Sequence, residues 1–135
     1  LQEWQGLPVQ GVVADVSTPE GRDTLVQAIQ TWLLESKPQQ GEPQLDILIN
    51  NVGTDIRKPS VEYTADDYDF VMRTNLQSMF ALTTQLHPWL KRKTTGGGGG
   101  LPTASVVNIG SVAGVTCMKS GSIYASTKAA MNQLT

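Results

Sequence analysis

Short apolar runs alternate along the chain with longer stretches in which apolar residues recur every three or four positions. The runs are rich in valine and isoleucine and lie at 9–16, 45–49 and 104–109. Runs of this kind are typical of strands that a parallel sheet buries on both faces. The longer stretches have the spacing of amphipathic helices and lie at 19–37, 65–90 and 121–134. The pattern therefore predicts three strands, each followed by a helix.

This alternation predicts an α/β fold with a doubly wound parallel sheet and right-handed crossovers. Capping residues mark the starts of two of the helices. Ser17 or Thr18 precedes the first helix, and Glu20 has the spacing to complete a capping box with Ser17. Thr64 precedes the second helix, with Asp67 three residues further on.

Asn75 interrupts the apolar stripe of the second helix. An unpaired primary amide on an apolar face costs about 1–3 kcal/mol, so this side chain should have hydrogen-bond partners. The pattern alone leaves open whether Asn75 is a satisfied core residue or part of a functional site.

Three polar residues near the end of the chain suit proton transfer to an oxygen atom. Ser111 follows the run at 104–109, so its hydroxyl stands at the carboxyl end of the sheet, where open α/β sheets bind ligands. Tyr124 and Lys128 are four residues apart and share one helix face. A free phenol ionises at about pH 10, and a cation within roughly 4–6 Å favours the phenolate. Tyr124 could therefore act as a general acid or base, although the same pair also occurs on ordinary helix surfaces.

These residues resemble a known catalytic tetrad. Ser111, Tyr124 and Lys128 match the serine and the Tyr-x-x-x-Lys motif of the classical short-chain dehydrogenase/reductase family. Asn75 matches the helix asparagine of the same tetrad. The surrounding residues are most similar to the tropinone-reductase-like branch. The resemblance implies a Rossmann-type doubly wound sheet.

A second motif carries the same resemblance. Residues 45–53 read Leu-Asp-Ile-Leu-Ile-Asn-Asn-Val-Gly, similar to the Asn-Asn-Ala-Gly signature after the fourth strand of that family. Val52 replaces the usual alanine and adds volume in a closely packed loop. The resemblance implies that Asp15 contacts the adenine ring of the cofactor. The full set of cofactor-binding residues that it implies is Asp15, Val16, Asn50, Asn51, Gly53, Tyr124 and Lys128.

The resemblance implies an NAD(P)-dependent oxidoreductase that interconverts a ketone and a secondary alcohol. Tyr124 would exchange a proton with the substrate oxygen, and Lys128 would assist it and bind the nicotinamide ribose. Ser111 would position the carbonyl group, and Asn75 would hold a water of the proton relay. NADP(H) is favoured by the branch and NAD(H) stays possible, because the residues that distinguish them are expected upstream of this sequence.

The composition limits the classes of binding partner that we expect. A net charge of −2 gives no electrostatic reason to expect nucleic acid or an anionic membrane, and no apolar run approaches the ~20 residues of a membrane helix. Cys117 is the single cysteine, so an internal disulfide is impossible, which fits a cytoplasmic location. We expect a small-molecule carbonyl or alcohol substrate, and the resemblance implies a homo-oligomer in the full-length protein.

The family's glycine-rich βαβ unit and its C-terminal substrate segments do not occur in the sequence. We therefore expect residues 1–135 to form a partial NAD(P)-binding Rossmann domain with strands 3, 4 and 5 and three flanking helices. The strands of a Rossmann sheet lie in the order 3-2-1-4-5-6, so strands 1 and 2 separate strand 3 from strand 4. The run at 9–16 has then lost its neighbour, so if these residues exist alone it should be detached from the sheet or paired with another chain.

Five consecutive glycines at 96–100 predict a flexible surface loop over 94–103. They follow a helix and precede a strand, which is the reverse of a dinucleotide-binding glycine loop. Besides a related enzyme that uses the same tetrad for epimerisation or dehydration, two alternatives to an active enzyme stay open: an inactive fragment, and a nucleotide-binding regulator derived from such an enzyme.

Overall fold

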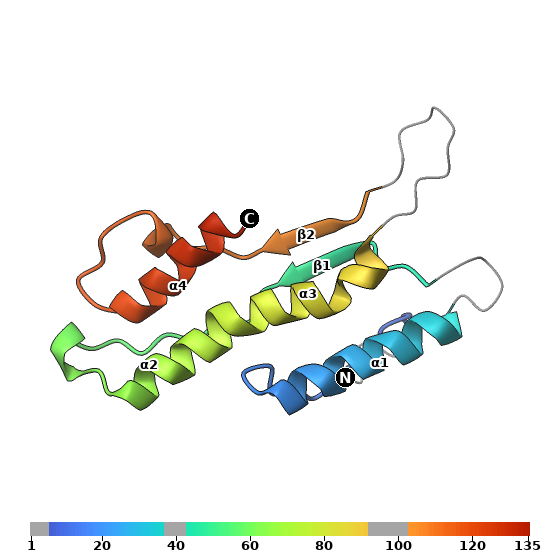
Figure 1. Cartoon of the computed structure of the whole chain (residues 1–135), viewed down its shortest axis with the longest axis horizontal. Helices are drawn as coiled ribbons and strands as arrows, with labels where there is room; N and C mark the ends of the chain where they lie inside the picture. Colours follow the sequence, from blue (N-terminus) through green and yellow to red (C-terminus); the bar gives the residue numbers. More distant parts are fainter. Residues whose placement is uncertain (1–5, 37–42, 92–102) are drawn as a thin grey trace.

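The computed structural model describes residues 6–36, 43–91 and 103–135 of the chain. Within them, two parallel strands form a sheet, in register from Ile47 opposite Ser105 to Asn50 opposite Asn108. Helix α3 packs on both strands, and α1 packs on α3 (Figure 1). The strands are β1 (Ile47–Asn50) and β2 (Ser105–Asn108), and the α-helices are α1 (Pro19–Ser36), α2 (Ala65–Met72), α3 (Ser78–Leu90) and α4 (Ser122–Gln133).

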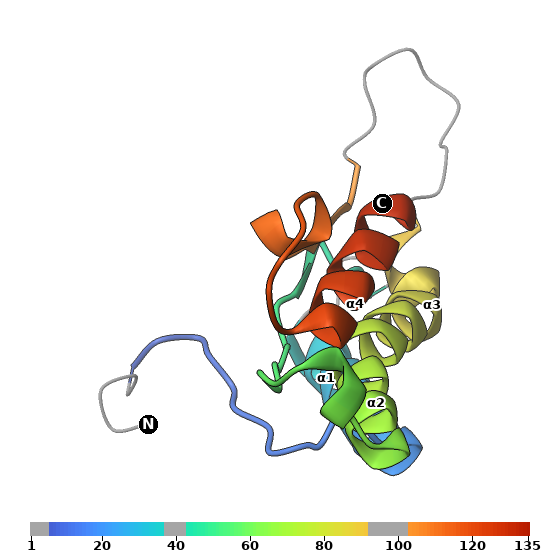
Figure 2. The ribbon, with the colours of Figure 1, turned by 90° about the vertical axis from the view of Figure 1, so that its left-hand side faces the viewer.

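These elements confirm the predicted α/β class and five of the six predicted segments. The exception is the run at 9–16, which forms no strand and pairs with neither β1 nor β2. Figure 2 shows this segment running out from the start of α1, and its residues Val9, Gln10 and Val12 line a groove together with the apolar stripe of that helix. Such a detached segment is what the loss of its neighbouring strands predicts. On β1, Ile47 and Ile49 are 57% and 59% exposed, so one face of the sheet has no cover in the described part of the chain.

The first helix begins differently from the prediction. Thr18, and not Ser17, caps α1, because its Oγ1 accepts a hydrogen bond from Gly21 N at 3.0 Å. The Ser17 hydroxyl instead donates to Asp15 Oδ1 at 2.7 Å, so the predicted capping box with Glu20 is wrong. Gly21 fixes this arrangement, since a Cβ there would lie 1.9 Å from the carbonyl oxygen of Asp15.

The second predicted helix is continuous but contains a π-helical turn, η3 (Arg73–Gln77), between α2 and α3. The backbone N–H of Ser78 donates to the carbonyl of Arg73, five residues back. Such turns frequently mark functional sites. Here the turn contains Asn75 and also Thr74, whose buried hydroxyl has no hydrogen-bond partner in the described part of the chain.

Two further sequence predictions concern the surface. The glycine-rich loop predicted over 94–103 lies outside the described residues, except for Thr103. Across the described ranges, no helix is both long and apolar enough to cross a membrane.

The loop between β1 and α2 is held in place by side chains. Thr64 and Asp67 form the predicted capping box at the start of α2. Asp67 Oδ2 also accepts a hydrogen bond from Lys58 Nζ at 2.5 Å. Tyr63 donates its hydroxyl proton to the carbonyl of Ile56. The loop between β1 and α2 is therefore fixed in position at the end that joins α2.

We predict that Asp67→Asn weakens this loop in a pH-dependent way. Hydrogen bonds from Lys58 and then Thr64 lower the pKa of Asp67 from 3.8 to about 2. A carboxyl group whose pKa is lowered by folding stabilises the protein above about pH 4, and this stabilisation is lost as the pH falls towards about 2. In urea unfolding, the variant should be less stable than the parent at neutral pH, and the difference should close as the pH falls through that range.

Asp66→Asn is the matched control, because within the described residues the bonds from Lys58 and Thr64 go to Asp67 and not to the adjacent Asp66. A difference between Asp67→Asn and the parent that stays constant from neutral to acid pH would contradict the prediction.

Candidate active site

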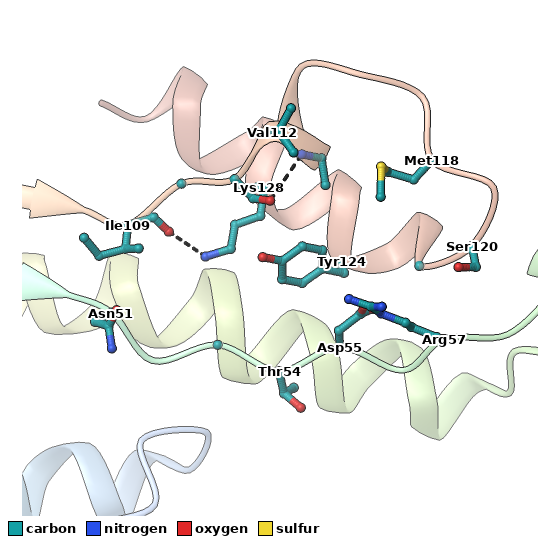
Figure 3. Close-up of a pocket in the computed structure, with 15 residues that line it drawn as sticks. Asn51, Thr54, Asp55, Arg57, Ile109, Val112, Met118, Ser120, Tyr124 and Lys128 are labelled. Atoms are coloured by element: carbon teal, nitrogen blue, oxygen red, sulfur yellow. Dashed lines mark hydrogen bonds and ion pairs between the residues drawn. The ribbon is translucent and has the colours of Figure 1, made fainter.

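A cavity of about 490 Å³ lies at the carboxyl ends of β1 and β2. Its walls come from the loop after β1, the loop after β2 and the first two turns of α4 (Figure 3). The structure brings five of the predicted site residues into this lining: Asn51, Gly53, Ser111, Tyr124 and Lys128.

Lys128 is the buried cation of the cavity, with 4% of its surface exposed. Its Nζ donates to the carbonyl oxygen of Ile109 at 2.6 Å and lies 5.6 Å from the centre of the Tyr124 ring. Figure 3 shows the hydroxyl of Tyr124 pointing towards this amine. An ammonium group has three donors, and Ile109 is its one hydrogen-bond partner among the described residues. The other two N–H groups are available to a ligand in the cavity.

Ser111 caps the start of a short 3-10 turn, η4 (Val112–Gly114), that packs against α4. Its Oγ accepts a hydrogen bond from Ala113 N at 3.2 Å, which leaves the hydroxyl proton free to be donated. Gly114 allows the turn to lie directly on the helix backbone: a Cβ there would be 2.8 Å from the carbonyl carbon of Lys128. The close packing of η4 on α4 thus holds Ser111 beside the tyrosine and the lysine.

Asn75 is fully buried and has the partners that the sequence predicted. Its Oδ1 accepts from Thr54 N at 2.8 Å, and its Nδ2 donates to Thr54 O at 2.9 Å and to Thr127 Oγ1 at 3.1 Å. Asn75 does not line the cavity. It joins the loop after β1 to the helix turn that carries Lys128. Thr127 was not predicted, since nothing in its spacing distinguishes it from other helical threonines.

Asn50 does not face the cavity either. Its Nδ2 donates to Thr83 Oγ1 at 3.1 Å and to Asn108 Oδ1 at 2.9 Å. The amide therefore joins the ends of the two strands to α3. Val52, the departure from the family motif, is 54% exposed, so its extra volume does not enter the core.

Asp15 and Val16 also lie outside the cavity. Asp15 forms a turn in which hydrogen bonds from the hydroxyl and the backbone N–H of Ser17 lower its pKa. Val16 is buried against the core. Their contact with the adenine of a cofactor stays a prediction.

The cavity has lining residues that were not predicted: Asp55, Arg57, Met118 and Ser120 are among them. They belong to the loops that follow β1 and β2. The only signal for them in the sequence was their place after a strand, which marks a loop near the site without showing which side chains point into it.

A parallel sheet with a cavity outside the carboxyl ends of its strands is the arrangement in which open α/β folds bind their ligands. The family model described as "short chain dehydrogenase" matches residues 1–135. The chain therefore belongs to the short-chain dehydrogenase family.

Curated relatives place it in the branch that the sequence resembles. The Tropinone reductase homolog At5g06060 of Arabidopsis thaliana is 43% identical over 100% of the chain and 46% of its own length. Senescence-associated protein 13 of the same plant is 46% identical over 99% of the chain and 45% of its own length. The chain thus spans about half the length of the curated relatives it matches.

Solved structures show the same fold. A putative short-chain dehydrogenase from Novosphingobium aromaticivorans superimposes with a TM-score of 0.76 at 28% identity, over 98% of this chain and 46% of that one. A complex of RhlG from Pseudomonas aeruginosa with NADP in its active site gives 0.71 at 34% identity, over 91% and 43%.

The packing of η4 on α4 can be tested at Gly114. We predict that Gly114→Ala destabilises the protein by about 1–3 kcal/mol, because the new methyl group meets helix backbone that cannot move aside. Denaturant unfolding of the variant and the parent measures the effect.

Gly110→Ala is the control. There a Cβ would meet only the side-chain oxygen of the exposed Asn132, at 3.3 Å. Its effect on stability should stay within about 0.5 kcal/mol. Equal effects of the two substitutions would show that η4 does not depend on close contact with α4.

Proposed function

We propose that this chain supplies the acid–base half of an NADP(H)-dependent oxidoreductase that interconverts a ketone and a secondary alcohol. The observation that carries the proposal is the buried Lys128 ammonium, next to the Tyr124 ring and in one cavity with Ser111. Because the chain covers about half of its relatives, the activity is proposed for the full-length protein. A cytoplasmic location stays a prediction, since one relative is named chloroplastic.

The cavity fits a nicotinamide nucleotide. Two N–H groups of the buried Lys128 ammonium need acceptors, and ribose hydroxyls would provide them. Asn51 and Gly53 in the loop after β1 would lie along the cofactor. The NADP bound to RhlG supports the phosphorylated cofactor for this chain. When bound, the nicotinamide supplies or accepts the hydride.

Side chains of the cavity would carry out the proton transfer. In the reduction direction, Tyr124 donates its phenolic proton to the carbonyl oxygen, and the Lys128 ammonium stabilises the resulting phenolate. Ser111, whose hydroxyl proton has no partner among the described residues, donates a hydrogen bond to the same oxygen. Asn75 keeps loop and helix in register, and its proposed hold on a relay water would use the second lone pair of Oδ1.

Tyr124→Phe tests this assignment. The substitution removes the proton donor and keeps the ring, so we predict a loss of turnover of about 10²–10⁴-fold. NADPH binding, followed by nucleotide fluorescence, should change little. Tyr68→Phe is the matched control, because Tyr68 is exposed on α2 and outside the cavity. Unchanged turnover in Tyr124→Phe would refute the role.

The same assays distinguish the two alternatives. A full-length protein that binds NADPH and reduces no ketone would be a nucleotide-binding regulator. We propose that the 135-residue chain by itself is inactive, because one face of its sheet is uncovered and residues 9–16 pair with neither strand within the part that the structure describes. It should leave the fluorescence of NADPH unchanged.

We also propose that the full-length protein is a homo-oligomer. A groove runs along α2, η3 and α3 to the end of α4 and is lined by Met72, Leu76, Phe80 and Leu134 together with Asp69, Arg73 and Gln77; Phe80 is 56% exposed. Phe80→Glu should therefore shift the protein towards monomer in sedimentation, because a charge cannot be buried there without a partner. Phe70→Glu, at an exposed aromatic residue outside the groove, should not. Equal oligomeric states of the parent, Phe80→Glu and Phe70→Glu proteins would contradict the proposal that this groove is the subunit interface.

A further inference from the structure

The cavity contains a charged pair that the proposed proton transfer does not use. Arg57 and Asp55 both line the cavity, and Arg57 Nε donates to Asp55 Oδ2 at 2.8 Å. The Arg57 side chain is 79% exposed and that of Asp55 is 21% exposed. Figure 3 shows both on the loop that runs below Tyr124.

Arg57 has donors left for a ligand. A guanidinium group carries five N–H bonds in a planar fork, and the contact with Asp55 uses only the one on Nε. Among the described residues, the two terminal nitrogens have no hydrogen-bond or ion-pair partner. Those nitrogens can bind both oxygens of a carboxylate at once, which a single ammonium cannot do.

The loop presents Arg57 from fixed positions on both sides. Before it, the backbone of Thr54 is bonded twice by Asn75, and the carbonyl of Ile56 accepts the Tyr63 hydroxyl. After it, Lys58 is bonded to Asp67. A specificity residue needs such support, because a freely moving cation gains little from a ligand.

Asp55 is fixed as well. It lies against Gly121, whose φ of +74° suits glycine, and a Cβ there would be 3.0 Å from Asp55 Oδ1. That oxygen is buried and has no hydrogen-bond partner among the described residues, so the carboxylate is held by packing and by Arg57. Asp55 thereby orients the guanidinium along the cavity wall.

The charges of the lining favour an anion. Lys128 and Arg57 contribute two positive charges and Asp55 one negative charge, which leaves one net positive charge around the described lining. In a partly enclosed site, this charge attracts anionic ligands and repels cationic ones.

We propose that Arg57 is a substrate-recognition residue and that the natural substrate is a ketone or alcohol bearing a carboxylate away from its reacting carbon. This inference rests on the proposed function and adds the substrate class. The proposed substrate class differs from the compound in the relatives' names, since tropinone is an amine that is protonated at neutral pH. Protonated aminoketones should bind poorly here.

Three cyclohexanones test the proposal, substituted across the ring from the carbonyl by a carboxylate, a methyl ester or a trimethylammonium group. Their binding is measured by calorimetry in the full-length Tyr124→Phe variant with NADPH present, so that no turnover occurs. The carboxylate should bind about five- to tenfold more tightly than the ester, and the ammonium compound least tightly. Adding Arg57→Gln should remove the preference, and Arg57→Glu should reverse it.

Lys119→Gln is the matched control. Lys119 is an exposed cation between two lining residues but does not line the cavity, so its loss should leave the preference intact. Equal binding of the three ketones, binding of none, or equal effects of Arg57→Gln and Lys119→Gln would overturn the inference. Turnover of the ester by the parent protein tests the proposed function separately, because it does not depend on charge.

Discussion

The site depends on keeping one ammonium group buried. Taking the charge of Lys128 out of water costs several kcal/mol unless it is compensated, and the carbonyl of Ile109 is its partner in the described part of the chain. That carbonyl directly follows β2, so α4 must lie close against the end of the strand. The absence of a side chain at Gly114 makes this approach possible. Strand, turn and helix are thus positioned by the need to satisfy a single charge.

A second constraint aligns the other wall of the site. Asn75 uses three hydrogen bonds to join the loop after β1 to α4, and it does so from within a π-helical turn. The buried hydroxyl of Thr74 in the same turn has no hydrogen-bond partner among the described residues, and a buried polar group left in that state costs about 1–3 kcal/mol. Proteins tolerate such costs where the geometry serves a site. The hydrogen bonds of Asn75 are a sufficient reason for this one.

Much of this organisation could be predicted from the sequence because it depends on local patterns. The runs at 45–49 and 104–109 were bounded by glycine and polar residues, and both form strands within two residues of the predicted ends. The box of Thr64 and Asp67 needs only its own spacing. By contrast, Ser17 and Thr18 were equally suitable caps, and the choice depended on the contact of Gly21 with the Asp15 backbone. Patterns cannot show contacts of that kind.

The two asparagines at the end of β1, Asn50 and Asn51, show that sequence patterns also fail to reveal contacts within the site. They are neighbours, so the alternation of an extended chain sends their side chains to opposite sides. Asn50 turns into the protein and joins β1 to Asn108 and Thr83, while Asn51 lines the cavity. The bonds of Asn50 hold the strand ends together in a sheet of two strands, which has little independent stability. The proposed acid–base site is therefore held by hydrogen bonds of the side chains of Asn50 and Asn75. The uncovered face of β1 at Ile47 and Ile49 lies apart from those bonds, so covering that face need not rearrange Ser111, Tyr124 and Lys128.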